Sequence, residues 1–162
     1  MLFLDESIFP IKPYLTYGWF LKGSQPVVKY EHKRRDKYCV MGALNSDHFI
    51  YELSDKLNSD IFKNFLVRLI DQFKKVVIVI DHGPYHVSKN MQEFYAENRE
   101  HLHVEYFPSY SPELDPIEQS WRETKKWLAI RNWNNKADLK EQLISAFQQD
   151  FVKIPIYDYL RT

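Results

Sequence analysis

Apolar residues recur along the chain with two different spacings, and these spacings predict its secondary structure. Near-continuous apolar or aromatic runs predict strands at residues 2–4, 14–21, 38–44, 76–80 and 103–107, with residues 49–53 extending or pairing with the third. Apolar positions spaced by three or four residues predict amphipathic helices at about residues 59–73, 87–95, 116–129 and 136–149. The chain therefore starts with strands and continues with alternating strands and helices.

The run Val76–Ile80 is the centre of this pattern. Five consecutive β-branched apolar residues predict a strand buried on both faces, in the middle of a parallel or mixed sheet. Asp81 follows the strand, and Gly83-Pro84 is typical of a turn. An acid at this position fits either of two roles: a ligand at the rim of the sheet, or the cap of the following helix.

The order of the elements predicts a mixed sheet with helices on its faces. An antiparallel meander that continues into a parallel βαβ half is the ribonuclease-H-like arrangement. The 162 residues are expected to form one domain, residues 1–162, and 44% hydrophobic residues are enough for a core.

Composition narrows the function only a little. The chain has 22 basic and 22 acidic residues, so a nucleic-acid interface would have to come from local patches. Its one cysteine, Cys39, lies in an apolar run and is expected in the core of a protein from a reducing compartment. No signal peptide or membrane span is predicted, which favours a soluble, cytoplasmic protein.

Three acids lie where the predicted sheet would bring them together. Asp5 is on the first strand, Asp81 ends the strand expected beside it, and Glu118 is in the first turn of the helix after Pro116. Converging carboxylates repel one another, and bound Mg²⁺ or Mn²⁺ would offset that repulsion. Two such ions can activate a water or a 3′-hydroxyl and stabilise the leaving oxygen of a phosphodiester. With 22 acids in the chain, the spacing alone is not specific.

Four segments of the chain carry the most distinctive motifs: Phe3-Leu4-Asp5-Glu6-Ser7, Gly18-Trp19, Ile80-Asp81-His82-Gly83-Pro84-Tyr85-His86 and residues 108–121. These segments resemble the DDE superfamily endonuclease domain, and in particular bacterial insertion-sequence transposases related to the mariner group. The resemblance covers essentially the whole chain, and its most specific part is Tyr-Ser-Pro-Glu-Leu-Asp-Pro-Ile-Glu at residues 110–118.

This resemblance implies a ribonuclease-H-like fold and DNA cleavage and strand transfer at element ends. It makes Asp5, Asp81 and Glu118 the catalytic and metal-binding triad, with two Mg²⁺ or Mn²⁺ ions as cofactors. The implied partners are DNA and a second copy of the chain in the active complex, on the nucleoid when DNA is bound. Such transposases usually carry an N-terminal helix-turn-helix region, which is absent from this chain and is expected to be separately encoded or missing.

The chain departs from the family pattern at two places near these acids. The family often has Asn-Ala where this chain has His82-Gly83, and usually has Asn where this chain has Asp115. Neither departure changes the triad. Asp115 is expected at the N-cap of the helix, where its side chain would accept a hydrogen bond from the backbone N–H of residue 117 or 118.

Two expected site residues also have structural explanations. Asp115-Pro116-Ile117-Glu118 is close to a capping box, so without the resemblance a capping role for Glu118 would be favoured. His86 begins the predicted helix five residues after Asp81, where it could orient a ligand, touch the DNA or make only local hydrogen bonds.

Two basic clusters are candidate DNA contacts, because phosphate charge dominates DNA affinity. They are Lys33, Arg34 and Arg35 in a polar connection, and Arg122, Lys125 and Lys126 on the helix of Glu118. For each cluster, an ordinary solvated face is the alternative. The tryptophans Trp121, Trp127 and Trp133 are expected mainly in the core, with base stacking as a minor alternative.

Two other functions remain open from the sequence. One is a truncated transposase remnant that folds without transposing, although the intact triad argues against decay. The other is a general nuclease of the same fold, against which the serine-proline loop before Glu118 argues.

Overall fold

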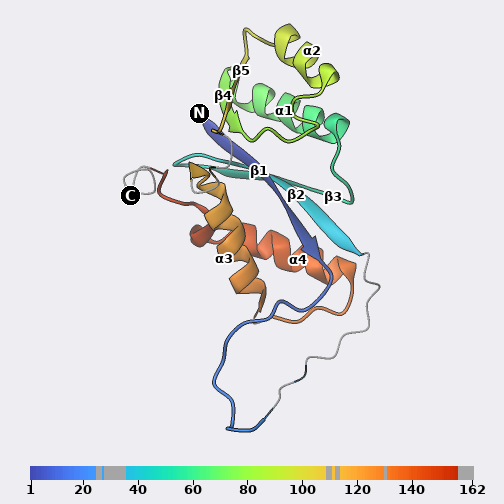
Figure 1. Ribbon diagram of the computed structural model, residues 1–162, viewed down its shortest axis with the longest axis vertical. Coiled ribbons are helices and arrows are strands. Elements are labelled where there is room, and N and C mark those ends of the chain that lie inside the picture. The colour runs from blue at the N-terminus through green and yellow to red at the C-terminus, as the bar shows by residue number, and fades with distance from the viewer. Residues whose placement is uncertain (25–26, 28–35, 109–110, 112–113, 130, 157–162) are drawn as a thin grey trace.

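A computed structural model of the protein describes residues 1–24, 27, 36–108, 111, 114–129 and 131–156. These residues form one five-stranded sheet with helices on both faces (Figure 1). The elements in chain order are β1 Leu2–Pro10, β2 Lys37–Leu44, β3 Phe49–Ser54, α1 Ser59–Phe73, β4 Val76–Ile80, α2 Lys89–Glu97, β5 Leu102–Tyr106, α3 Ile117–Ala129, α4 Lys136–Phe147 and the 3₁₀ turn η2 Asp150–Val152.

The strand order β3-β2-β1-β4-β5 confirms the predicted mixed sheet. β1, β2 and β3 form an antiparallel meander, with Asp5 of β1 opposite Gly42 of β2. β1 and β5 each pair in parallel with β4, so α2 is the crossover of a parallel βαβ half. This is the ribonuclease-H-like arrangement, and it places the end of β4 beside β1.

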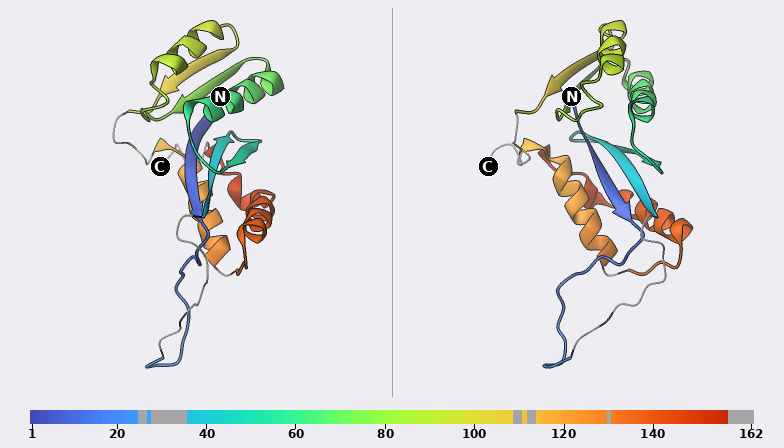
Figure 2. Two further views of the ribbon diagram at one scale, coloured as in Figure 1. Left: turned by 90° about the vertical axis from the view of Figure 1, so that its right-hand side faces the viewer. Right: turned by 45° about the vertical axis from the view of Figure 1, so that its right-hand side comes forward.

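Alternating side chains of the strands build a core on each face of the sheet. Phe3 and Phe9 of β1 pack in the cluster that α3 and α4 cover, whereas Leu2 and Leu4 pack in the cluster that α1 and α2 cover. Figure 2 shows the two helix pairs on opposite sides of the sheet. Cys39 lies in the core as expected.

The expected helices form close to their predicted bounds. Asn58 caps α1, and its side chain accepts a hydrogen bond from the backbone N–H of Ile61 at 2.9 Å. α2 begins at Lys89, so Val87, expected on its inner face, lies before the helix and is 43% exposed. No helix in the described part of the chain combines the length and the apolar character that crossing a bilayer requires.

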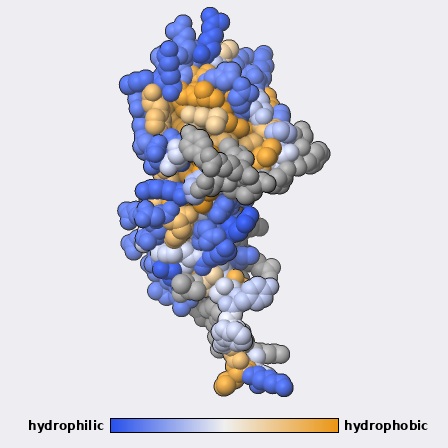
Figure 3. All heavy atoms as spheres, turned by 90° about the vertical axis from the view of Figure 1, so that its left-hand side faces the viewer, coloured by the Kyte–Doolittle hydropathy of each residue, from blue (hydrophilic) through white to orange (hydrophobic). Residues whose placement is uncertain are grey.

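The strand predicted at residues 14–21 is wrong. β2 pairs directly with β1 as far as Pro10 and Lys37, and residues 11–24 leave the sheet as an extended arm (Figures 1 and 2). Tyr17 and Trp19 of this arm are fully exposed, and Figure 3 shows the arm projecting from the body. The aromatic residues gave this segment β-propensity, but among the described residues no strand pairs with it, and only Tyr14 packs against the core, beside Trp133.

β4 is less covered than expected. Val76, Ile78 and Ile80 are buried under α1 and α2, but Val77 and Val79 on the other face are only half-buried. β2 is covered on both faces, as predicted: Val40 and Leu44 join one cluster, and Met41 and Ala43 the other.

Candidate active site

A pocket of about 510 Å³ opens where β4 ends beside β1 and the N-terminus of α3. Its lining combines acidic and apolar residues, and it includes all three acids expected as the triad. The lining residues are Asp5, Asp81, His82, Gly83, Pro84, Phe107, Pro108, Ser111, Asp115 and Glu118. Side chains from three distant parts of the sequence therefore share one space.

Asp5 enters the pocket from the middle of β1 and is held by α3. The indole Nε1–H of Trp121 donates a hydrogen bond to its Oδ2 at 2.9 Å. Burial is the main cause that raises the pKa of Asp5 to about 7, and the charges of Glu6 and Glu118 add to it. The hydrogen bond from Trp121 acts against this rise.

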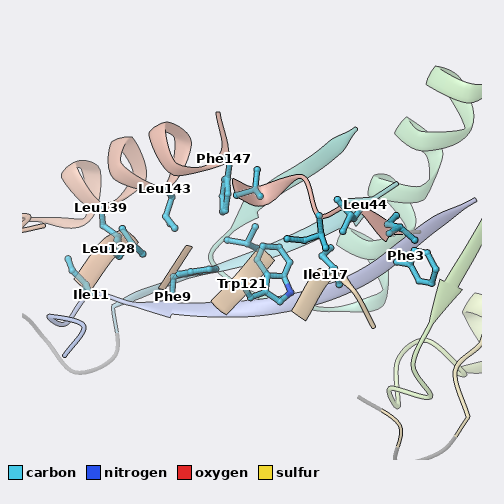
Figure 4. Packing of buried hydrophobic residues seen from close by; sticks show 14 of the residues in the cluster. Phe3, Phe9, Ile11, Leu44, Ile117, Trp121, Leu128, Leu139, Leu143 and Phe147 are labelled. Carbon is cyan, nitrogen blue, oxygen red and sulfur yellow. The ribbon is translucent and has the colours of Figure 1, made fainter. Parts of the chain in front are cut away.

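Trp121 reaches Asp5 because α3 lies unusually close to the sheet. Gly42 is opposite Asp5 on β2, and a Cβ at this position would lie 2.6 Å from the Trp121 ring and 2.8 Å from Ile117. Figure 4 shows Trp121 beside β1 between Phe9 and Ile117. The absence of a side chain at residue 42 thus lets the helix that carries Glu118 approach Asp5.

Asp81 follows β4 directly, and a tight turn fixes one of its oxygens. Its Oδ1 accepts hydrogen bonds from the backbone N–H of Gly83 and from Nδ1 of His86, both at 2.8 Å. In the part of the chain that the structure describes, no hydrogen bond reaches Oδ2. The side chain is 64% exposed, so this oxygen is available on the pocket side.

His86 is buried between Asp81 and Glu6. It lies in the turn before α2, its side chain is 2% exposed, and its Nε2 is 3.1 Å from Oε1 of Glu6. Burial by itself lowers the pKa of His86, but Glu6 and Asp81 outweigh it, so the pKa is raised. A DNA contact of His86 stays a prediction, and its burial and its contacts with Asp81 and Glu6 agree with the alternative, that it orients a ligand.

Asp115 caps α3 as predicted. Its Oδ1 accepts a hydrogen bond from the backbone N–H of Ile117 at 3.2 Å. The residue is only 7% exposed, yet it also lines the pocket. Burial, and after it the charge of Asp5, raises the pKa of Asp115 to about 8.

Glu118 is exposed in the first turn of α3 and faces the pocket rather than the cap. Its carboxylate accepts no hydrogen bond from the described residues, whereas a capping box would bond it to the backbone N–H of Asp115. Glu118 therefore does not have the capping role that the sequence Asp115-Pro116-Ile117-Glu118 suggested.

The donor set of this pocket fits a hard divalent cation. Its candidate ligands are all carboxylate oxygens, which Mg²⁺ and Mn²⁺ prefer. Burial, and after it the charge of neighbouring acids, raises the pKa of Asp5 and of Asp115, and a bound cation would favour the ionised form of both. Within the described ranges, no three acidic, histidine or cysteine side chains are yet close enough to hold one ion. The acids share the pocket without converging on a single point.

The basic residues of α3 differ in their availability. Arg122 is exposed one turn after Glu118, so both lie on the same side of the helix. Lys125 lies over the ring of Phe9 at 5.7 Å, and Lys126 forms an ion pair with Glu123. Arg122 is thus the basic residue of α3 best placed to meet a phosphate. The other cluster, Lys33, Arg34 and Arg35, lies outside the described residues.

The tryptophans expected in the core lie there to different degrees. Trp121 and Trp133 are buried, and Trp127 packs against the same cluster with Arg131 over its ring. His82 is exposed at the pocket and stacks on Tyr106 with ring centroids 4.7 Å apart.

Two residues of this site were not identified from the sequence. Glu6 points to the opposite face of β1 from Asp5. Its contact with His86 joins residues 80 positions apart, so no local sequence pattern predicts this contact. Gly42 had a usable signal, because a glycine inside an otherwise apolar strand often marks a close approach.

Fold and pocket together define a ribonuclease-H-like domain with an acidic site at the end of its central strands. A family model described as DDE superfamily endonuclease matches residues 1–140. The chain therefore belongs to the DDE superfamily endonuclease family, as the sequence motifs indicated. The comparison with curated proteins gave no match.

Solved structures of the Mos1 mariner transposase share this fold. The Mos1 paired end complex with Mn aligns with a TM-score of 0.75 at 17% identity, covering 99% of this chain and 52% of that chain. The catalytic domain of Mos1 aligns with a TM-score of 0.71 at 15% identity, covering 99% and 76%. A chain of the simian T-cell lymphotropic virus intasome complex aligns with a TM-score of 0.52 at 12% identity, covering 90% of this chain and 46% of that chain. The present chain spans about half the length of the Mos1 chain in the paired end complex.

Proposed function

We propose that this chain is the catalytic domain of a DNA transposase, which cleaves phosphodiester bonds at the ends of an element and joins the 3′-hydroxyl to target DNA. The observation that carries the proposal is that Asp5, Asp81 and Glu118, from three separate elements, line one pocket. Membership of the endonuclease family and the Mos1-like fold support it.

In this proposal the three acids hold two Mg²⁺ or Mn²⁺ ions. Bound ions of this kind supply an activated water or 3′-hydroxyl and stabilise the leaving oxygen. The protein contributes the placement of the ligands: Trp121 orients the carboxylate of Asp5, and the turn at Gly83 fixes Oδ1 of Asp81. Glu118 is exposed and can move toward them, because no capping bond restrains its carboxylate.

DNA is the proposed substrate and partner. Arg122, on the same side of α3 as Glu118, would bind a backbone phosphate beside the reacting bond. A second copy of the chain is proposed in the active complex, since the matched Mos1 structure is a paired end complex. The chain is neutral overall, so binding to DNA by this chain alone should be weak, independent of sequence and strongly salt-dependent.

The proposal is tested by incubating the chain with supercoiled plasmid and Mn²⁺, and then with a pre-cleaved oligonucleotide bearing a free 3′-hydroxyl. We expect metal-dependent nicks and joining of the oligonucleotide to the plasmid. Asp81→Asn should abolish both products, whereas Asp71→Asn, which removes an exposed acid of α1, should change neither.

Nicking that survives in Asp81→Asn or in excess EDTA would contradict the proposal. Nicking without joining would instead favour a general nuclease of the same fold. A chain that binds Mn²⁺ but produces neither product would favour the truncated remnant.

A further inference from the structure

Behind the pocket, a buried histidine connects Asp81 to a fourth acid. Nδ1 of His86 lies 2.8 Å from Oδ1 of Asp81, and its Nε2 lies 3.1 Å from Oε1 of Glu6. The side chains of His86 and Glu6 are 2% and 11% exposed. Glu6 does not line the pocket, so this contact is on the far side of Asp81 from the other acids.

The imidazole ring has little freedom to turn. Phe62 of α1 packs against it with ring centroids 4.5 Å apart, and the ring of Tyr85 lies edge-on at 4.3 Å. The hydroxyl of Tyr95 donates a hydrogen bond to the backbone carbonyl of His86 at 3.2 Å. The ring is therefore fixed by packing from α1 and from the turn before α2, as well as by the two acids.

Through this arrangement, the positions of two pocket acids, Asp5 and Asp81, both depend on β1. Asp5 and Glu6 are neighbours on β1, and their side chains leave opposite faces of the sheet. Asp5 enters the pocket directly, while Glu6 acts through His86 on Oδ1 of Asp81. A carboxylate whose first oxygen is held in this way keeps its second oxygen directed at a bound cation.

We propose that Glu6 and His86 are positioning residues that hold the carboxylate of Asp81 in the orientation needed for metal binding. The inference rests on the proposed function for the identity of the bound cation. It assigns to Glu6 and His86 no contact with DNA or with the reacting atoms. Their effect is on the direction of one ligand.

Two amide substitutions separate the two contacts of the ring. The amide nitrogen of asparagine is as many bonds from the backbone as Nδ1 of histidine, so His86→Asn can still donate to Asp81. The amide nitrogen of glutamine corresponds to Nε2, so His86→Gln can still reach Glu6 but not Asp81. Phe62→Leu is the matched control, because it loosens the packing of the ring and leaves both hydrogen-bonding groups in place.

Affinity for Mn²⁺ is measured by calorimetry on the metal-free protein. His86→Gln should raise the Kd roughly 10–100-fold, the usual cost of removing a hydrogen-bond partner behind a ligand. His86→Asn should restore most of the affinity, and Phe62→Leu should lower the Tm while raising the Kd far less than His86→Gln does, because both hydrogen-bonding groups of the ring remain. Glu6→Leu, which places an apolar side chain opposite Met41 of β2, should raise the Kd about tenfold. This variant tests the inference if His86→Gln fails to fold.

Crystal structures of the metal-free wild type and of His86→Gln give a second readout. We expect the Asp81 carboxylate to turn away from its wild-type orientation in the variant. An unmoved Asp81 together with a wild-type Kd in His86→Gln and Glu6→Leu would overturn the inference. If the wild type bound no Mn²⁺, the proposed function would fail, but the two crystal structures would still decide the positioning role.

Discussion

Replacing Asp115 with asparagine should stabilise the metal-free protein at neutral pH. Burial and the charge of Asp5 raise the pKa of Asp115 from 3.8 to about 8 in the folded protein. Between these two values the folded protein keeps a proton that the unfolded chain releases. The free energy of unfolding therefore falls as the pH rises through this window and levels off above it.

The size of the effect follows from the two pKa values. At about 1.4 kcal/mol per pH unit, the retained proton costs about 4 kcal/mol of unfolding free energy by pH 7. Asparagine never ionises, and it caps a helix about as well as aspartate. Because part of this rise in the pKa of Asp115 comes from the charge of Asp5, we expect Asp115→Asn to recover about 2–4 kcal/mol at pH 7.

The assay is urea denaturation in EDTA, followed by circular dichroism. Wild type and Asp115→Asn should have nearly the same free energy of unfolding at about pH 4, where aspartate is half-protonated even in the unfolded chain. The two free energies should diverge as the pH rises to about 8. Saturating Mn²⁺ should reduce the difference, because a bound cation favours the ionised acids. Parallel pH profiles for the two proteins, or a wild type whose stability rises over this range, would show that Asp115 does not keep its proton in the folded protein.

Three further substitutions test how the site is built. Gly42→Ala places a Cβ against Trp121 and Ile117, so it should cost about 1–3 kcal/mol of stability, seen as a lower Tm, and should also reduce cleavage. Trp121→Phe removes the donor to Oδ2 of Asp5 while keeping most of the ring; it should weaken Mn²⁺ binding and leave the fold intact by circular dichroism. Arg122→Ala should weaken DNA binding equally for all sequences and reduce the slope of log affinity against log salt by about one, without changing Mn²⁺ affinity.

The sequence predicted the strand that ends just before Asp81, and it also predicted the strand of Asp5. The pairing of β1 with β4 confirms that the two strands are neighbours. Both predictions depended on local patterns: β-branched runs for the strands and i, i+3/i+4 spacing for the helices. The same rule failed for residues 14–21, because aromatic residues favour a strand only when a neighbour covers them. Leu15 is 86% exposed, so the described part of the chain supplies no such neighbour for it.

Long-range contacts were the part that local patterns could not predict. The hydrogen bond of Trp121 to Asp5 joins residues 116 positions apart, and that of His86 to Glu6 joins residues 80 positions apart. The double role of Asp115 was also hidden. Its capping position follows from Asp115-Pro116, but its place in the pocket follows from the approach of α3 to the sheet.

Asp5, Asp81 and Glu118 are proposed to bind the metal ions of the active site together. The most direct measurement is an anomalous difference map from a crystal of this chain soaked in Mn²⁺. We predict two peaks roughly 3.5–4 Å apart inside the pocket, with Asp5, Asp81 and Glu118 as protein ligands and Glu118 moved toward the other two. A map with no peak in the pocket, or with Asp115 in place of Glu118 as a ligand, would contradict the account.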